Sequence, residues 1–438
     1  MLAALAEIVS DSALQVLGYL WQFIRMFWPI AVFPILLKLL VSTWLFWRQS
    51  IFKRSVKWLF LEIKIPREIR KSPQAMEKVL EGMHSLRNAP GNLREKWWDG
   101  EVTRWFALEM VSFGGEIHFY VRIYHKQRNL VEAAFFSYYP DIEIVEAEDY
   151  VDKFPSSVKE MNQQGFDLWG SEMVYDREEA YPIKTYFDFE SPEEEKQFDP
   201  ISVFLEVLGK IKKEEIVGIQ ILIAPADLKW YRAWEGLLSK MKEPKVKKEK
   251  SESQVETFAR LIARSPGETD VLKAVEKNLS KPAFDTILRF IYLAPKKGFY
   301  DSYARRGLAG AFNQYASLDM NKFRQNYTVS TRTQIWYYPF IFPVRRNDYR
   351  KQRLLYTFIH REVPPETWMG RFITSYVFNL NFASRYFKMN TECLATIFHP
   401  PTFTVLTAPH VKRVESRKAS PPAGLAIFGD EKAIEKFK

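Results

Sequence analysis

Residues 27–47, FWPIAVFPILLKLLVSTWLFW, form an almost uninterrupted apolar run, which limits what this chain can become. As an α-helix the run would be about 30 Å long, the thickness of a bilayer core. Its Leu, Ile, Val and Phe residues favour insertion by about 4–7 kcal/mol, and Lys38 opposes it by about 3 kcal/mol. The alternative is a buried core helix, to which Pro29 and Pro34 are poorly suited. The run therefore predicts a membrane-spanning helix.

Basic residues lie almost entirely on one side of this run. Arg25 is the one basic residue before it, whereas residues 48–71 are rich in Lys and Arg. By the positive-inside rule, we expect a single-pass protein of the cell inner membrane with most of the chain in the cytoplasm. No basic residue opens the chain and no small-residue cleavage site follows the run, so no cleaved signal peptide is expected. The residues expected to place the anchor are Trp28, Lys38, Trp44, Trp47, Arg48, Lys53, Arg54 and Lys57.

Residues 12–24 are also apolar but too short to span a bilayer alone. We expect them to form an interfacial helix, because Arg25 would be poorly placed inside a helical hairpin. The hairpin remains the alternative.

Composition agrees with a folded, anchored protein. Aromatic residues make up 16% and hydrophobic residues 47% of the 438 residues, which excludes a disordered chain. The single cysteine, Cys393, excludes an internal disulfide framework and a multi-cysteine metal site. The net charge of +10 suits anionic lipid and is compatible with nucleic acid.

The region after the anchor alternates between strand and helix patterns. Gly114-Gly115 separates two alternating runs and predicts a β-hairpin. A strand at 183–190 would open a second, similar unit. We therefore predict an α+β fold in which an N-terminal transmembrane helix precedes tandem ferredoxin-like (split βαβ) units. The expected parts are the anchor with its basic flank (1–57), a first unit (58–180), a second unit with a charged spacer at 242–253 (181–325), and a mixed C-terminal region with a Pro-rich exit (326–438). Within this last region, residues 326–412 are expected to be mostly extended, with one helix at 391–398.

Motifs for common catalytic chemistry are absent from the sequence. GxxxxGK[ST], GxGxxG, HExxH, GxSxG and CxxC do not occur, and the six histidines do not cluster at metal-ligand spacing. We expect no enzymatic activity, cofactor or metal. A site built from dispersed carboxylates stays open, because such a site leaves no sequence signature.

Two basic segments could contact nucleic acid. Lys240–Lys250 is a lysine run, for which a solvated linker is the simpler interpretation. Residues 345–353 follow the aromatic residues of 336–340, and basic and aromatic residues together are typical of single-strand grooves. The alternative is a core strand followed by a solvated turn. The candidate contacts are Arg345, Arg346, Arg350, Lys351 and Arg353.

Residues 389–425 resemble the segment that precedes the motor domain in type IV secretion-type, conjugative DNA-transfer ATPases. The matching pieces are Asn390-Thr391-Glu392, Leu394-Ala395-Thr396, His399-Pro400-Pro401 and Pro421-Pro422-Ala423-Gly424-Leu425. Cys393 replaces an acidic residue of the family pattern. From the residues alone, the segment predicts a capped helix, a proline turn and an extended exit.

In that family the proline exit leads into a P-loop motor, whereas this sequence ends at GDEKAIEKFK. The resemblance therefore implies a non-catalytic membrane scaffold that docks a separate P-loop ATPase of a DNA-transfer system. A membrane-associated protein that binds single-stranded nucleic acid is the alternative. The expected partners are the membrane, the ATPase, DNA and further copies of this chain. The expected docking residues are Glu392, Leu394, His399, Pro400, Pro401, Pro421 and Pro422.

Overall fold

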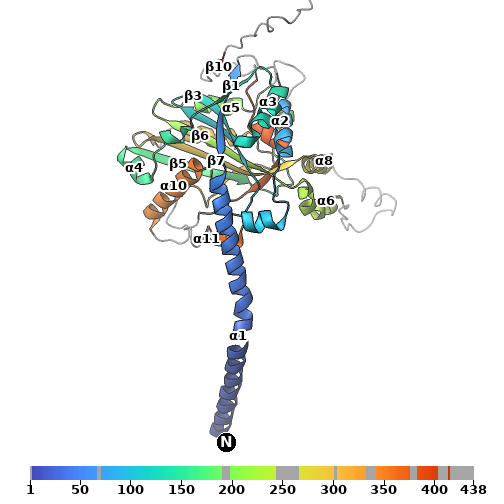
Figure 1. The fold of residues 1–438 in the computed structure, drawn as a ribbon, viewed down its shortest axis with the longest axis vertical. Helices are drawn as coiled ribbons and strands as arrows, with labels where there is room; N and C mark the ends of the chain where they lie inside the picture. Colours follow the sequence, from blue (N-terminus) through green and yellow to red (C-terminus); the bar gives the residue numbers. More distant parts are fainter. Residues whose placement is uncertain are drawn as a thin grey trace, which may run out of the picture.

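The computed structural model describes residues 2–66, 71–189, 198–242, 266–299, 303–331, 342–374, 382–402 and 413–414. The chain begins with one long helix, α1 (Leu2–Ser55), which projects from the globular part (Figure 1). By length and composition, Trp21–Ser55 could cross a membrane. Because α1 is continuous, the helical-hairpin alternative for residues 12–24 is wrong.

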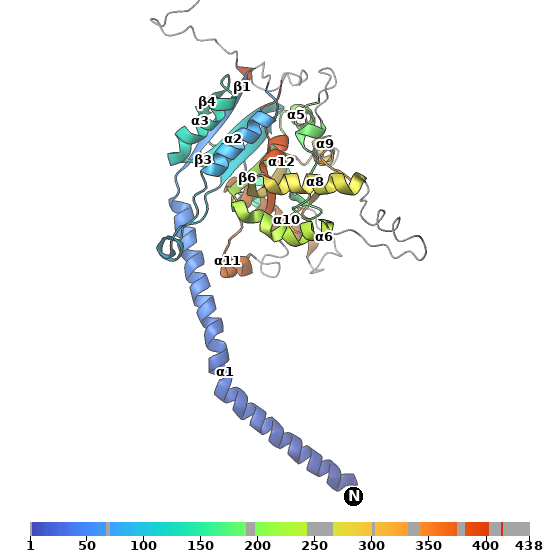
Figure 2. The ribbon, with the colours of Figure 1, turned by 90° about the vertical axis from the view of Figure 1, so that its right-hand side faces the viewer.

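The helix α1 is bent rather than straight, as Figure 2 shows. Pro29 and Pro34 lie inside it. A proline has no N–H to donate and its ring collides with the preceding turn, so prolines are a common cause of such bends.

The globular part is a mixed α+β structure built on one antiparallel sheet, to which the described residues contribute nine strands. The first half has β1 (Trp58–Pro66), α2 (Gln74–Ser85), β2 (Phe106–Phe113), β3 (Glu116–Tyr124), α3 (Arg128–Tyr138) and β4 (Glu143–Glu146). The second has β5 (Phe166–Tyr175), α5 (Ser202–Gly209), β6 (Ile216–Pro225), β7 (Ala283–Pro295), α9 (Tyr303–Asn313) and β8 (Phe323–Gln325). The strand β9 (Phe387–Asn390) pairs with β7, and β10 (Arg413–Val414) makes a short parallel pair with the end of β1.

The two halves share one strand order. It is β4-β1-β3-β2 in the first half and β8-β5-β7-β6 in the second. The strands β2 and β6 pair antiparallel from Phe106 opposite Ile223 to Phe113 opposite Ile216, which joins the halves into one sheet.

The remaining helices cover the sheet and its ends. They are α4 (Val158–Gln163), α6 (Glu235–Lys242), α8 (Pro266–Ser280), α10 (Pro343–Ile359), α11 (Trp368–Ile373) and α12 (Thr391–Ile397). A single π-helical turn, η1 (Glu95–Asp99), precedes β2. Short 3-10 turns are η2 (His125–Gln127), η3 (Tyr150–Lys153), η4 (Tyr186–Asp188) and η6 (Leu228–Trp234).

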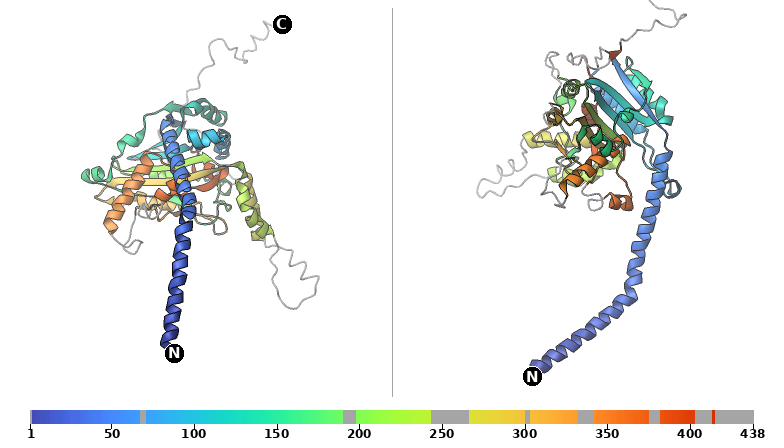
Figure 3. Two further views of the ribbon diagram at one scale, coloured as in Figure 1. Left: turned by 60° about the horizontal axis from the view of Figure 1, so that its bottom comes forward. Right: turned by 90° about the vertical axis from the view of Figure 1, so that its left-hand side faces the viewer.

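The two faces of the sheet have separate cores, because alternate side chains of a strand point to opposite faces. On one face, α2, α3, α5, α9 and α12 pack on residues such as Leu108, Phe119, Ile219 and Phe290. On the other, α4 and α10 pack on Val111, Leu168 and Ile291. The C-terminal end of α1 lies over this second face, where Phe52 packs against a small cluster that includes Ala107 and Leu222 (Figure 3).

The hairpin at Gly114-Gly115 is confirmed, and both glycines have positive φ (59° and 99°), as a tight hairpin turn requires. The strand expected at 183–190 is wrong: Thr185 and Asp188 form a capping box around η4 instead. β5, which pairs with β7 and β8, is the first strand of the second half. The expected mostly extended character after 326 is also wrong where α10 forms, because buried Leu354, Leu355 and Phe358 repeat at helical spacing.

Candidate membrane-facing site

Exposed apolar side chains gather beside α1 at the level of residues 38–48. They come from the loop around η1 and from α11, and we call them the collar. Its members are Leu93, Trp98, Trp368, Phe372 and Ile373. Leu93 is 77% exposed, Trp98 63% and Trp368 45%. Apolar surface of this extent beside a long apolar helix is typical of a membrane or partner contact.

Hydrogen bonds hold η1 against α1. The Trp44 indole Nε1 donates to the carbonyl oxygen of Trp97 over 3.0 Å, and the Arg48 guanidinium donates to the carbonyl oxygen of Trp98. Gly100 ends η1 with φ of 69°, and a Cβ at this position would lie 2.5 Å from the backbone carbon of Arg48. Glycine therefore permits both the turn and the close approach to α1.

The helix α11 is fixed on α1 at a neighbouring level. Its Met369 N–H donates to Ser42 Oγ over 2.7 Å. The Lys38 ammonium lies 5.7 Å from the centre of the Trp368 ring, within the range of a cation–π contact. The Thr367 side chain caps the helix by accepting from the Gly370 N–H. Figure 2 shows α11 at the end of the globular part nearest the projecting length of α1.

The residues expected to place the anchor lie along α1 or just beyond it. Trp28, Trp44 and Trp47 are exposed, as are Lys38, Arg54 and Lys57. Arg48 is half-buried by its contact with η1, and the half-buried Lys53 lines a cleft. Several of these residues therefore hold the globular part against α1, a role the sequence did not reveal.

The cleft has a volume of about 910 Å³ and lies between the end of α1, the 363–374 segment and the neighbouring strands. Its walls include Trp105 and Tyr386. Its charged lining residues are Lys53, Asp285, Glu366, Arg371, Arg385 and Lys388. Basic side chains therefore outnumber acidic ones in the lining.

The expected docking residues of the 389–401 segment lie in the interior. Glu392, Leu394 and His399 are each at most 3% exposed, and Pro400 and Pro401 are also buried. Buried as they are, these side chains are not accessible to a docked partner. Pro421 and Pro422 lie outside the described residues.

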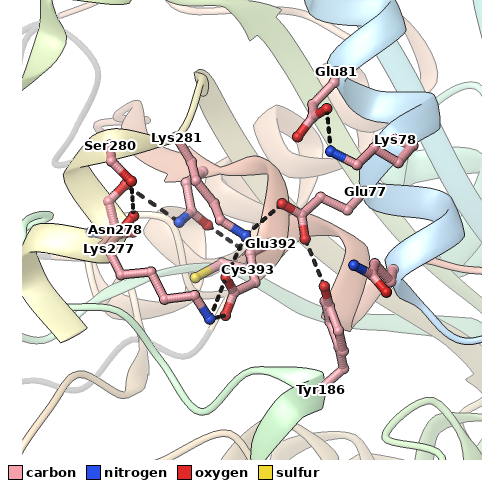
Figure 4. A network of polar contacts seen from close by, with 12 residues as sticks. Glu77, Lys78, Glu81, Tyr186, Lys277, Asn278, Ser280, Lys281, Glu392 and Cys393 are labelled. Carbon is pink, nitrogen blue, oxygen red and sulfur yellow. Dashed lines mark hydrogen bonds and ion pairs between the residues drawn. The ribbon is translucent and has the colours of Figure 1, made fainter. Parts of the chain in front are cut away.

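Internal contacts explain the burial of Glu392. Lys281 Nζ lies 2.6 Å from both Glu392 Oε2 and Glu77 Oε1, and Lys277 also contacts Glu392 (Figure 4). Burial opposes the charge on Lys281, but its hydrogen bonds to Glu392 and Glu77 outweigh this and raise its pKa. Asn390 caps α12 by accepting from the Cys393 N–H over 2.7 Å, so the expected capped helix is confirmed.

His399 and Asp199 form a second buried pair. His399 Nε2 lies 2.8 Å from Asp199 Oδ1, and the Thr402 N–H donates to Asp199 Oδ2 over 2.9 Å. Burial alone would raise the pKa of Asp199, but His399 and the N–H donors lower it to about 2. The N-T-E and His-Pro-Pro pieces thus tie the C-terminal segment to both halves of the fold.

The arginines expected to contact nucleic acid lie on α10, largely in internal contacts. Arg346 and Arg350 are buried, and Arg350 donates to the carbonyl oxygens of Tyr327 and Ser330. Lys351 pairs with Asp167, and the half-buried Arg353 stacks near Phe382. Arg345 is exposed. The aromatic residues 336–340 and the lysine run from 243 onward lie outside the described residues.

Buried charged and polar residues from distant parts of the sequence line up across the middle of the sheet, and each carboxylate among them contacts an arginine. We call Glu109, Gln220, Arg289 and Glu172 the polar row, because they are direct cross-strand neighbours on β2, β6, β7 and β5. All are at most 1% exposed. Arg289 pairs with Glu172 at 2.8 Å, and Arg361 pairs with Glu109 at 2.6 Å and with Asp149 at 2.7 Å. The described residues contain no group of His, Cys, Asp or Glu side chains that could hold a metal ion.

The collar is the feature that sequence reasoning missed. Trp97-Trp98 and Trp368 were a signal in the sequence. Tryptophans within otherwise polar segments are unusual where the side chains face water. The contact with α1 could not be read from the sequence, since some fifty residues separate Trp98 from Arg48 and far more separate Met369 from Ser42.

No curated protein matches this chain. A family model matches residues 49–412, a range that includes the collar and the cleft as well as the whole sheet up to β9. The chain therefore belongs to the family described as Domain of unknown function (DUF8128).

Proposed function

We propose that this protein is a non-catalytic scaffold of the cell inner membrane that docks a separate P-loop ATPase of a type IV secretion-like DNA-transfer system. The observation that carries the membrane part is α1 with its collar. Water-exposed apolar side chains cost roughly 1.5–3 kcal/mol each relative to burial, so a bilayer around them would be strongly favourable. The docking part rests on the resemblance of residues 389–425.

We infer that η1 and α11 dip into the cytoplasmic leaflet while α1 crosses the bilayer once. The contacts with α1 fall between Lys38 and Arg48, which is the cytoplasmic half of the apolar run under the positive-inside rule. This arrangement also accounts for Lys38, because its ammonium finds the Trp368 ring instead of bare hydrocarbon.

Each half of the sheet would be a ferredoxin-like unit. Support comes from the β-α-β-β-α-β element order, which both halves follow, and from their shared strand order. In this interpretation the second unit begins at β5 and carries an insertion with α6 and α8 between β6 and β7.

The ATPase cannot use the side chains of α12, since these are buried. We therefore assign docking to the segment beyond β10, which contains Pro421 and Pro422. Deleting all of 389–438 would remove α12 and the last two residues of β9 from the core and test stability rather than docking.

A sharper experiment deletes residues 415–438 from the tagged full chain. The protein is extracted from native membranes in mild detergent, and its partners are identified by mass spectrometry. We expect a P-loop ATPase with the full chain and none with the deletion. Deletion of 243–250, another charged segment outside the described residues, is the matched control and should retain the ATPase. A full chain without any ATPase partner would reject the docking function.

A further inference from the structure

The cleft beside α1 carries more positive charge than its carboxylates neutralise. Lys388 pairs with Asp285 at 2.5 Å, which leaves Lys53, Arg371 and Arg385 with Glu366. None of these three basic side chains forms an ion pair with a carboxylate of the described residues. Burial lowers the pKa of Lys53, and Glu366 and Glu362, which are near enough to act on the ammonium but form no ion pair with it, oppose this shift. The cleft is therefore suited to an anion.

The place of the cleft along α1 limits which anion can reach it. Lys53 lies about 9 Å beyond Trp47, the last residue of the apolar run, at the helical rise per residue. That distance brings it to the interfacial layer outside the hydrocarbon core. Arg371 belongs to α11, whose exposed Phe372 and Ile373 are part of the collar. Arg371 therefore links the charged lining of the cleft to the apolar collar along α11.

We propose that this cleft binds the phosphate-bearing headgroup of an anionic phospholipid, with the acyl chains lying along α1 and the collar. Arginine presents paired donors that match phosphate oxygens, and lysine adds a point charge. A volume of about 910 Å³ is enough for a headgroup and its glycerol. Trp105, whose ring lies 5.7 Å from the Lys53 ammonium, forms an amphipathic wall suited to this depth. The inference depends on the proposed membrane anchorage and is independent of ATPase docking.

The test uses the full chain in nanodiscs of phosphatidylcholine with a minor fraction of phosphatidylglycerol. Lipid that stays bound on release from the disc is counted by native mass spectrometry. We expect retained phosphatidylglycerol with the natural protein, and roughly tenfold less with Lys53→Gln, because one charge-assisted contact is lost. Arg54→Gln is the control: Arg54 is the exposed neighbour on α1 and does not line the cleft, so retention should be unchanged.

Three outcomes would overturn the proposal. Equal retention by the Lys53→Gln and natural proteins would place the lipid elsewhere. Equal loss with Arg54→Gln would show general attraction to the basic flank and no cleft site. Displacement of the lipid by millimolar inorganic phosphate would assign the cleft to a free phosphate. In all three cases the protein would remain in the disc, whereas its failure to enter a disc would reject the anchorage itself.

Discussion

The polar row and the collar distribute polarity in opposite ways. Beneath α10 the protein buries charged side chains in the middle of a sheet, and beside α1 it leaves tryptophan and leucine exposed. The buried charges are matched: Arg289 with Glu172, and Arg361 with Glu109 and Asp149. The exposed apolar side chains have no protein layer over them among the described residues. The charges of the polar row are neutralised by other residues of the same protein, whereas the collar suits an apolar environment outside the protein.

The two regions therefore have different expected roles: the polar row in the stability of the fold, and the collar in the proposed contact with the membrane. A buried ion pair contributes little net stability, but removing one partner leaves an uncompensated charge. Loss of an exposed apolar side chain costs the fold almost nothing. Substitutions in the polar row should therefore change stability, and substitutions in the collar should change membrane contact.

Arg361→Met should have the largest effect. Arg361 is about 1% exposed, and its guanidinium donates to both oxygens of Glu109, at 2.6 and 3.0 Å. We expect the free energy of unfolding to fall by about 3–5 kcal/mol, measured by chemical unfolding of the full chain in mild detergent. In the control Arg324→Met, the lost surface pair with Asp176 should cost under about 1 kcal/mol. Equal losses would mean that the buried pair between Arg361 and Glu109 of the polar row matters no more for stability than a surface ion pair.

Lys281→Met should have the next largest effect. This substitution removes the ammonium shared by Glu77 and Glu392, while Lys277 still neutralises part of Glu392. We expect a loss of about 2–3 kcal/mol. The neighbouring Lys78 pairs with Glu81 at the surface, as Figure 4 shows, so Lys78→Met should cost under about 1 kcal/mol. A loss with Lys281→Met as small as the control's would mean that water reaches this network.

Stability should also fall in acid because of Asp199. Its pKa is about 2 in the folded protein against about 3.9 when unfolded, so the stabilisation is fully present above pH 4. It amounts to about 2.6 kcal/mol, and most of it is lost as the pH falls from about 4 to about 2. Unfolding curves at pH 5, 3 and 2 measure the slope, which should be shallower in Asp199→Asn. An unchanged slope in this variant would assign the acid sensitivity to other carboxylates.

The sequence predicted the local elements better than their combination. The length of the apolar run and the Gly114-Gly115 turn each act over short distances, and they predicted the helix and the hairpin correctly. The polar row could not be predicted, because Glu109, Gln220 and Arg289 become neighbours only through strand register. Without that register, a buried glutamate and a surface glutamate look alike in sequence.

The docking assignment shows a related limit. The pattern at 390–401 is distinctive because Asn390, Glu392 and His399 each make specific contacts inside the fold. A distinctive motif can be conspicuous because it docks a partner at the surface or because it makes contacts inside the fold. Only its burial distinguishes these two roles, and burial depends on the packing of segments that lie far apart in the chain.

Cys393 offers a test with no change in sequence. Burial raises the pKa of its thiol to about 12, and the side chain is 1% exposed. A maleimide at pH 7 should therefore leave the folded protein unlabelled and react once it is unfolded in denaturant. Rapid labelling of the folded protein would show that α12 opens readily, which would contradict the tight packing of α12 and its buried ion pairs in the core.

Leu93→Cys and Leu318→Cys compare two highly exposed leucines, at 77% and 93%, one in the collar and one before β8. Each substitution should change the free energy of unfolding by under about 0.5 kcal/mol, because neither side chain is packed. Unreactive Cys393 leaves each new thiol as the single site for an environment-sensitive nitrobenzoxadiazole maleimide. In nanodiscs the label at 93 should shift to shorter emission wavelengths and be quenched by brominated lipid, while the label at 318 should report water. If both labels report water, the collar lies outside the bilayer and its exposed side chains must meet a protein partner instead.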